Sequence, residues 1–408
     1  MVSRWSPRRI LYVWDADYPW DIRVEKICRT LVEAGHQVAI ATRNSAGRLV
    51  DESLPEGRVM RLRPWQAFGA ALDKASSFPA FFNPRWIAHI ASCVRLLQPE
   101  VIVVRDLPLA PAGLWVGRHE GVPVMLDMAE NYPAMIRDVW RTGRAGRVDA
   151  LVRNPAAIAL VEKYVLARVD HVITVVEESS ERVHAIGVPR ERISCVSNTP
   201  PIARADAVND RSVRGRALRL TYLGLMELPR GLLDVLEAVA ELSRAKMPVE
   251  VDLIGDGRDF ALLRAKAAAL GLREPTVRFL GRLENQEALR VVATADVGLV
   301  PHHADESWNT TIPNKLFDYM AAGLPVITSD AVPAARVVRS TGSGLVYRSQ
   351  DSGDLARCVR AMADPELRQR MASAGRDAIR SVYNWEADSR VLFEAVERVT
   401  ALAAGRHC

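Results

Sequence analysis

The sequence predicts an α/β protein with two doubly wound domains, and three observations carry this prediction. Apolar, β-branched runs alternate with longer segments of helical period, which is typical of parallel sheets covered by helices. The 408 residues exceed what one hydrophobic core usually accommodates. Residues 200–216 are polar, carry no clear period and separate two such alternating series, as an interdomain linker does.

The first series precedes this linker. A helix between its first two strands places Val24, Ile27 and Leu31 on one face and ends at Gly35. The strands of this series are expected at residues 9–14, 37–42, 58–63, 101–105, 123–128, 171–176 and 193–198.

The second series follows the linker. Its helices are expected through residues 232–243, near 259–270 and near 284–294. Its strands are expected at residues 218–224, 249–255, 277–281, 297–301 and 344–347. Ligands of doubly wound sheets bind beyond the carboxyl ends of the strands. We therefore expect the ligand at the loops that follow these strands, in a cleft between the two domains.

Composition excludes several classes of protein. No apolar run is long enough to span a bilayer, and Asp15 and Asp17 interrupt the apolar start, which argues against a secretory signal. Five scattered cysteines and eight histidines, including the pair His302-His303, show neither a disulfide framework nor metal-ligand spacing. Reduced thiols fit the cytoplasm best.

The net charge of +5 lies in the first half of the chain. Residues 1–205 hold 27 Lys and Arg against 22 Asp and Glu, and the remainder holds 27 against 27. A basic half suits contact with anionic lipid or a phosphorylated acceptor, although an ordinary solvated surface has the same composition. No dense basic stripe with stacking aromatics is present, so nucleic acid is not the expected partner.

The stretch "TTIPNKLFDYMAAGLPVITSD", residues 310–330, predicts a helix with an unusual polar face. Pro313 suits its first turn, Thr310 or Thr311 its cap, and Gly323 its end. Helical period places one set of side chains against the sheet: Leu316, Phe317, Met320 and Ala321. The other set is Asn314, Lys315, Asp318 and Tyr319.

The amino end of this helix is a candidate phosphate seat. It supplies free backbone N–H groups and about half a positive charge, to which Lys315 adds a full one. A surface helix with an inconsequential Lys315–Asp318 pair is the alternative.

The segment "PNKLFDYMAAGLPVITSD" resembles the signature helix of glycosyltransferase family 4. Further family motifs occur in order: "YLGLMELPRGLLDVLEA" (222–238), "LIGDGRDFALLRAKA" (253–267), "VRFLGRL" (277–283), "ADVGLVP" (295–301) and "YNWEADSRVLFEAV" (383–396). The resemblance implies the GT-B fold, in which two Rossmann-like domains face each other across a cleft. It implies an acceptor domain over residues 1–204, a donor domain over 205–382, and a closing helix over about 383–408 that crosses back onto the first domain.

The resemblance also implies a nucleotide-sugar site in the second domain, with no metal. Gly224 and the pair Arg230-Gly231 match the loop that approaches the diphosphate, while Leu225 replaces an arginine for which Lys315 stands in. Arg230, Lys315 and the helix end sum to about +2.5, close to the charge of a diphosphate. The positions that match donor-binding groups of the family are Gly224, Arg230, Gly231, Gly255, Asp256, Arg282, Thr310, Thr311, Asn314, Lys315 and Asp318.

Two of these positions depart from the family pattern. Asp318 corresponds to the glutamate that holds the ribose hydroxyls and is one methylene shorter, and Thr310 replaces a second glutamate near the transferred sugar. For the glycines of "GDG" (255–257) and "GR" (281–282), tight turns after strands are an equally good explanation.

In the first domain, Ala129-Glu130 stands where the family commonly has His-Asp. With this pair replaced, the catalytic candidates are Glu130, Asn131, Arg230 and Lys315. For Glu130 the alternative is a carboxylate that complements a helix start.

Acceptor contacts are expected in the same domain. The candidates are Asp21, Arg23, Asp106, Arg137 and Arg141, with a loop-fixing ion pair as the alternative for Asp21 and Arg23. The aromatic stretch 65–86 and the arginine stretch 137–153 either dock a lipid-phosphate-linked glycan at the membrane or belong to the core and the solvated surface.

The expected protein is therefore a retaining, metal-independent glycosyltransferase of the cytoplasm or the inner face of the membrane. It would move a sugar from a nucleotide sugar to a saccharide or lipid-linked acceptor. The alternatives are a sugar-nucleotide epimerase of the same fold and an inactive donor-binding partner subunit.

Overall fold

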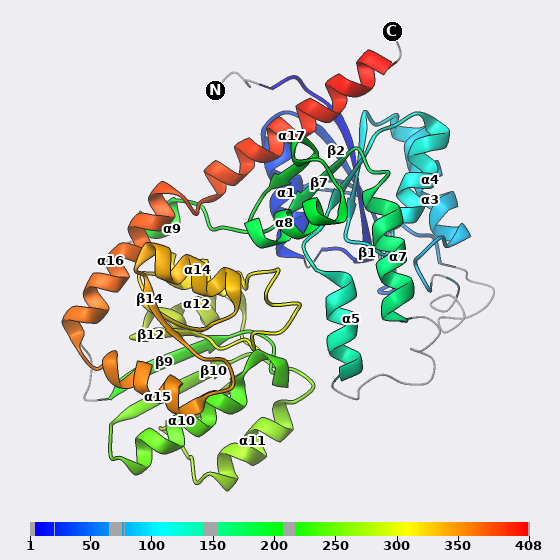
Figure 1. Ribbon diagram of the computed structural model, residues 1–408. Coiled ribbons are helices and arrows are strands. Elements are labelled where there is room, and N and C mark those ends of the chain that lie inside the picture. Colours follow the sequence, from blue (N-terminus) through cyan, green and yellow to red (C-terminus); the bar gives the residue numbers. More distant parts are fainter. Residues whose placement is uncertain are drawn as a thin grey trace. The chain divides into compact units, whose positions relative to one another are not determined.

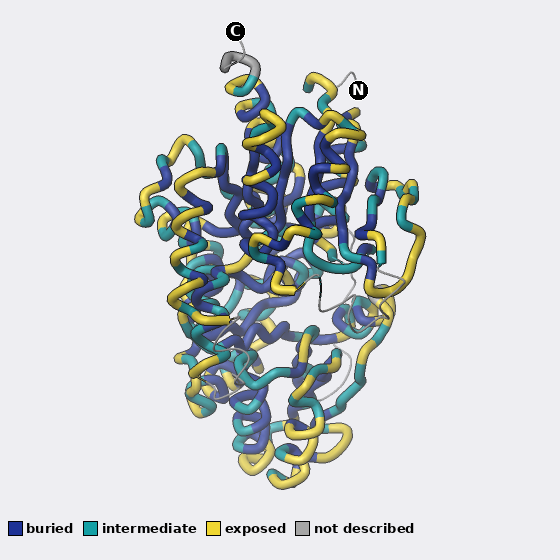
Figure 2. Tube along the Cα trace, turned by 90° about the vertical axis from the view of Figure 1, so that its right-hand side faces the viewer, coloured by how far each residue is buried: buried dark blue, intermediate teal, exposed yellow. Residues whose placement is uncertain are grey.

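The computed structural model describes residues 5–19, 21–64, 76, 78–141, 153–206 and 217–406. The chain forms two compact units, which are described separately. The N-terminal unit comprises Met1–Ser197 and Asp388–Cys408, and the C-terminal unit comprises Asn198–Ala387. Figure 2 shows buried stretches in the interior of each unit and exposed positions at the periphery; most strands, but not all, consist largely of buried residues.

The N-terminal unit contains an eight-stranded sheet of order β3-β4-β2-β1-β5-β6-β7-β8 (Figure 1). All neighbouring pairs are parallel except β3 with β4. The strands are β1 (Arg9–Asp17), β2 (Gln37–Arg43), β3 (Asp51–Leu54), β4 (Gly57–Arg61), β5 (Val101–Arg105), β6 (Val124–Asp127), β7 (His171–Thr174) and β8 (Ile193–Cys195). The strand order reverses at β1, whose neighbours are β2 and β5, so the sheet is doubly wound.

Helices with buried apolar faces complete this unit. They are α1 (Ile22–Glu33), α3 (Pro84–Leu97), α4 (Ala110–Glu120), α5 (Tyr132–Arg141), α7 (Pro155–Leu166) and α8 (Glu177–Ile186). The chain returns through α17 (Trp385–Arg406), whose Glu397 pairs with Arg8 at 3.1 Å and whose Arg398 donates to the Glu191 carbonyl at 2.7 Å. The last helix thus packs on the first domain's residues.

The C-terminal unit contains six parallel strands in the order β11-β10-β9-β12-β13-β14. They are β9 (Leu218–Leu223), β10 (Val249–Ile254), β11 (Val277–Gly281), β12 (Val297–Val300), β13 (Val326–Ser329) and β14 (Gly344–Tyr347). Their helices are α9 (Ala203–Asp206), α10 (Leu232–Arg244), α11 (Phe260–Ala269), α12 (Asn285–Ala293), α13 (Lys315–Ala321), α14 (Val332–Thr341), α15 (Ser352–Ala361) and α16 (Pro365–Ser381). This order is the Rossmann order, with its switch point between β9 and β12.

The predicted α/β class is confirmed, and three local expectations are corrected. The edge strand β3 was not expected, because "DESL" is polar and an edge strand needs no apolar alternation. Within the expected linker, residues 203–206 form α9. The helix of the signature segment begins at Lys315 and not at Pro313; its cap is Asn314, without a side-chain hydrogen bond, so Thr310 and Thr311 do not cap it.

Among the described residues, no helix is long and apolar enough to cross a bilayer. The four cysteines in the described part of the chain are free, and these residues contain no cluster of three or more metal-ligating side chains.

Candidate active site

Glycines line the carboxyl ends of β9 and β10, where close backbone approach excludes a side chain. A Cβ on Gly255 would lie 1.9 Å from the carbonyl oxygen of Gly224, and both residues have positive φ angles. The Gly224 N–H donates to the Ile254 carbonyl at 2.9 Å, and the Gly255 N–H donates to the Gly281 carbonyl at 2.8 Å. The ends of β9, β10 and β11 are therefore hydrogen-bonded together, and glycine is required where their backbones approach most closely.

The amine of Lys315 lies beside the carboxyl end of β9. Lys315 is the first residue of α13, it is 8% exposed, and its Nζ has no hydrogen-bond partner in the part of the chain that the structure describes. The Nζ lies 2.7 Å from the position that a Cβ of Gly224 would occupy and 3.9 Å from the Tyr222 ring centroid. Burial, together with the nearby charge of Arg230, holds the pKa of Lys315 well below its ordinary value. A buried amine without an acceptor is costly, which points to an anionic ligand.

Arg230 is oriented by two side chains from the loop after β12. Its Nη1 lies 3.3 Å from Nε2 of His302, and its guanidinium carbon lies 5.3 Å from the Trp308 ring centroid. Burial and the two cations Lys315 and Arg230 hold the pKa of His302 well below its ordinary value. The imidazole is therefore neutral and accepts a hydrogen bond from Arg230.

Gly231 allows this arrangement. A Cβ at this position would lie 1.7 Å from the carbonyl oxygen of Pro301, and φ is +70°. The residue links the short 3₁₀ helix that ends at Arg230 to α10 and lets it pack against the end of β12. Arg230 and His302 are brought together by this contact.

The polar face expected for the signature helix is only partly present. Tyr319 is buried, and its hydroxyl accepts from the Leu223 N–H at 2.9 Å, while Lys315 is buried and Asn314 is exposed. The Asp318 carboxylate pairs with Arg204 of α9 at 2.7 Å. Helical period placed these side chains on one face but did not show that neighbouring loops cover that face.

The remaining donor candidates lie on the same edge of the sheet. The hydroxyl of Thr310 donates to the carbonyls of Glu306 and Ser307, each at 3.2 Å, and Thr311 is buried. Asp256 and Arg282 are exposed in the loops after β10 and β11. The Met226 N–H donates to the Asp256 carbonyl at 3.0 Å, which joins the loops that follow β9 and β10.

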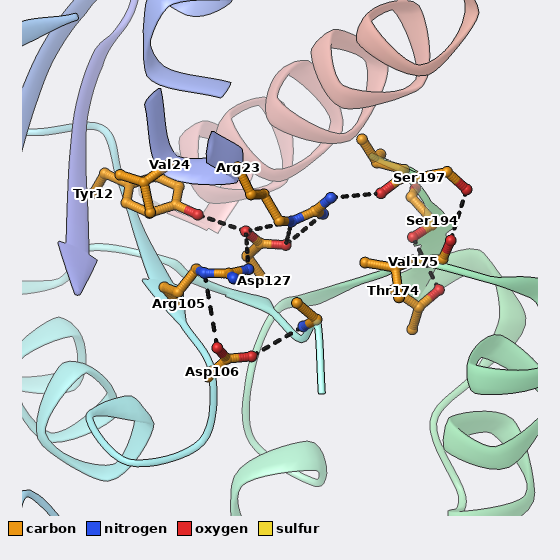
Figure 3. A network of polar contacts seen from close by, with 12 residues as sticks. Tyr12, Arg23, Val24, Arg105, Asp106, Asp127, Thr174, Val175, Ser194 and Ser197 are labelled. Carbon is orange, nitrogen blue, oxygen red and sulfur yellow. Dashed lines mark hydrogen bonds and ion pairs between the residues drawn. The ribbon is translucent and has the colours of Figure 1, made fainter. Parts of the chain in front are cut away.

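In the N-terminal unit, a buried ion pair ties the carboxyl ends of the strands (Figure 3). The Asp127 carboxylate at the end of β6 accepts from Arg23, with 2.6 Å from Nη2 to Oδ1, and from the Tyr12 hydroxyl. Arg23 also donates to the Val196 carbonyl at 2.9 Å. Burial opposes ionisation of Asp127, but Arg23 and Arg105 outweigh it, so the pKa of Asp127 lies below its ordinary value.

The other candidates of this unit surround the ion pair or lie on α5. Asp21 caps α1 by accepting from the Arg23 and Val24 N–H groups at 2.8 and 2.9 Å. Asn131 is buried and accepts from the Ala134 N–H at 3.2 Å at the start of α5, and the adjacent Glu130 is exposed. On α5, Arg137 is half-buried and Arg141 is exposed and paired with Asp138 at 2.9 Å. Asp106 follows β5 and contacts Ala129.

The aromatic stretch divides between core and surface. Trp86 is fully buried, whereas Phe78 and Phe82 are each 48% exposed. Positions 65–75 and 142–152, which hold part of the expected aromatic and arginine stretches, lie outside the described residues.

Comparison with known families identifies the protein class. The model described as "Glycosyl transferase 4-like domain" matches residues 21–199, and the one described as "Glycosyl transferases group 1" matches residues 217–364. The chain belongs to the group 1, family 4-like glycosyltransferases. The resemblance seen in the motifs is thereby confirmed, as is the expectation of a nucleotide-sugar-dependent glycosyltransferase.

Curated relatives of this glycosyltransferase act on different substrates, as their names indicate. This chain is 24% identical over 296 residues to a glycogen synthase of Mycobacterium tuberculosis, and the match covers 72% of this chain and 67% of the relative. It is 31% identical over 180 residues to a phosphatidyl-myo-inositol mannosyltransferase of Mycobacterium leprae, covering 44% and 46%.

A solved structure supports the fold of this glycosyltransferase. The sucrose-phosphate synthase of Thermosynechococcus elongatus aligns with a TM-score of 0.75 and 18% identity over 97% of this chain and 100% of that one. The predicted GT-B fold is confirmed.

Sequence reasoning missed several residues of this site. His302 was considered only as a metal ligand and Trp308 was not considered, although both lie in the loop after an expected strand. Arg105, the last residue of β5, was also missed and pairs with Asp21 at 3.4 Å. Their positions after strand ends were the available signal, but partners far apart in the chain were not visible from it.

Proposed function

We propose that this glycosyltransferase binds the diphosphate of its donor against Lys315, Arg230 and the backbone at Gly224. The observation that carries the proposal is the buried Lys315 amine, which has no hydrogen-bond acceptor and lies directly against Gly224. A bound diphosphate would supply the missing acceptor and the missing negative charge. The ligand would then stabilise a side chain whose amine is otherwise unsatisfied.

The charge of this seat suits a leaving diphosphate. Lys315 and Arg230 together contribute about +2 when both are protonated, without a contribution from the seven-residue helix α13. These cations would stabilise the negative charge that develops as the sugar departs, so we propose transfer without a metal. Retention of configuration follows from the resemblance to family 4.

The acceptor is proposed to be a hydroxyl of a saccharide or of a lipid-linked glycan. A glycogen synthase and a phosphatidyl-myo-inositol mannosyltransferase are both among the relatives. The basic first half of the chain and the exposed Phe78 and Phe82 favour action at an anionic membrane surface of the cytoplasm.

A donor and acceptor screen tests the function. UDP-, GDP-, ADP- and dTDP-sugars are offered with glycan and lipid-linked acceptors, and a glycosylated acceptor is expected with one of them. Conversion of the nucleotide sugar without an acceptor would indicate an epimerase, and binding without turnover an inactive subunit.

The diphosphate seat is tested separately by calorimetry. Arg230→Ala is expected to weaken nucleoside diphosphate binding by about 1.5–3 kcal/mol, the scale of a charge-assisted hydrogen bond. Arg244→Ala is the matched control, because Arg244 is exposed on the last turn of α10. Equal affinity of both variants and the wild type would refute the seat.

A further inference from the structure

The turn after β5 has an unusual backbone conformation. Asp106 has a φ of +58°, in the left-handed region that few residues other than glycine adopt. Aspartate and asparagine tolerate this region because their short side chains form local hydrogen bonds. The Asp106 N–H donates to the Asp127 carbonyl at 2.9 Å, so the turn is anchored to the end of β6.

The side chain of Asp106 holds the loop that follows β6. Its Oδ1 accepts from the Ala129 N–H at 3.0 Å. Immediately before Ala129 in the chain, the Met128 N–H donates to the Ile173 carbonyl at 2.8 Å. Two positions after Ala129, Asn131 accepts hydrogen bonds from the first turn of α5, with its side chain from the Ala134 N–H and with its carbonyl from the Met135 N–H. Glu130 therefore lies between a residue fixed by Asp106 and a residue fixed by α5.

Arg105 lies beside the Asp106 carboxylate. Its Nε lies 3.7 Å from Oδ2 of Asp106, and its Nη1 lies 3.7 Å from Oδ2 of Asp127. Figure 3 shows its guanidinium between these two carboxylates. Burial raises the pKa of Asp106, and Arg105 opposes this rise. The hydrogen bond from Ala129 needs only an acceptor oxygen, which the side chain presents in either protonation state.

We propose that Asp106 is a positioning residue for glycosyl transfer, which acts through Ala129 to fix Glu130 at the carboxyl end of the N-terminal sheet. This role depends on the acceptor oxygen of Asp106 and on its left-handed backbone conformation, and it does not depend on the charge of the Asp106 carboxylate. The proposal rests on the proposed function through the catalytic candidacy of Glu130. The reason is geometric, because a displacement of about 1 Å in a catalytic group lowers rates by up to roughly a hundredfold.

Two substitutions separate the acceptor from the charge. Asp106→Asn keeps an acceptor oxygen and tolerates the left-handed backbone, so its kcat is expected to be at least about threefold higher than that of Asp106→Gly. Asp106→Gly keeps the backbone but removes the acceptor, and kcat is expected to fall at least about tenfold while the donor KM changes less than about twofold. Nucleoside diphosphate affinity is expected to be unchanged in both variants, because the diphosphate seat belongs to the other unit, and far-UV circular dichroism with thermal unfolding is the fold control.

A double variant tests whether Asp106 acts through Glu130. Asp106→Gly combined with Glu130→Gln is expected to be no slower than the slower single variant, because a displaced Glu130 has no further effect once its carboxylate is absent. Multiplicative losses would overturn the proposal, as would a kcat of Asp106→Gly equal to the wild type or a kcat of Asp106→Asn as low as that of Asp106→Gly.

Hydrogen exchange gives a readout that does not depend on turnover. Amides from Ala129 to Asn131 are expected to exchange faster in Asp106→Gly than in the wild type and Asp106→Asn. Unchanged exchange would overturn the positioning role. An absence of turnover by the wild type with every donor would instead count against the proposed function, and the exchange result would still decide whether Asp106 holds the loop.

Discussion

Replacement of Lys315 by methionine is expected to remove the proton uptake that accompanies donor binding in the wild type. Lys315 is 8% exposed, and its amine is buried without a hydrogen-bond acceptor among the described residues. Burial and Arg230 hold the pKa of Lys315 well below its ordinary value. A bound diphosphate would favour the charged amine and raise that pKa, so binding would take up a proton. Methionine keeps a similar shape and removes the charge.

The magnitude has two parts. A hydrogen bond from a protonated amine to a phosphate oxygen is worth about 1.5–3 kcal/mol, which is roughly a 10- to 150-fold change in affinity. Protonation of the Lys315 amine costs about 1.36 kcal/mol for each unit by which the pH exceeds the pKa of this amine in the ligand-free protein. Wild-type affinity is therefore expected to fall by up to about tenfold per pH unit, whereas the affinity of Lys315→Met stays constant.

Calorimetry in buffers of different ionisation enthalpy measures this proton. Between about pH 7 and 8.5 the phosphate groups are fully ionised, since their second pKa is about 6. The wild type is expected to take up as much as about one proton per nucleoside diphosphate, and Lys315→Met none. Lys246→Met is the matched control, because Lys246 is exposed in the same unit. It is expected to behave as the wild type.

Thermal unfolding of the same variants provides a second measurement. A folded-state pKa below the unfolded value means that the unfolded chain binds more protons, so wild-type stability rises with pH up to the unfolded pKa. Lys315→Met lacks this dependence and is expected to melt higher near neutral pH, because the unsatisfied amine is gone. If Lys315→Met bound nucleoside diphosphate with wild-type affinity and wild-type pH dependence, the amine would not contact the diphosphate.

Two further predictions concern carboxylates. Asp127→Asn leaves the buried Arg23 without its counter-ion and is expected to cost about 3–5 kcal/mol of unfolding free energy, measured by urea titration. Because the pKa of Asp127 is lowered in the folded state, its contribution is present above the unfolded pKa of about 3.9 and is lost as pH falls through the folded pKa; an equally steep acid loss in Asp127→Asn would contradict this assignment. Asp318→Asn is expected to reduce discrimination between ribose and deoxyribose donors by about 1 kcal/mol, a modest value because Asp318 is partly exposed and shared with Arg204. Equal discrimination in competition kinetics would remove Asp318 from the ribose site.

The sequence by itself determined the two doubly wound domains, the positions of all their strands except β3 and β13, and the glycines at the strand ends. These features depend on local period and on backbone conformations that residues dictate within a few positions. The segment around Lys315 was recognisable for the same reason.

Only the tertiary structure decided which polar groups are buried and which of them meet. Lys315 reaches Gly224, which lies in a different strand–loop connection, and its burial depends on Tyr222 and on the loop after β9. Arg23 and Asp127 form one buried pair across 104 positions of sequence. Helical period indicates which side of a helix is polar. The packing of distant elements decides whether the polar side chains on that side are exposed to water, form an ion pair or are buried without a hydrogen-bond partner.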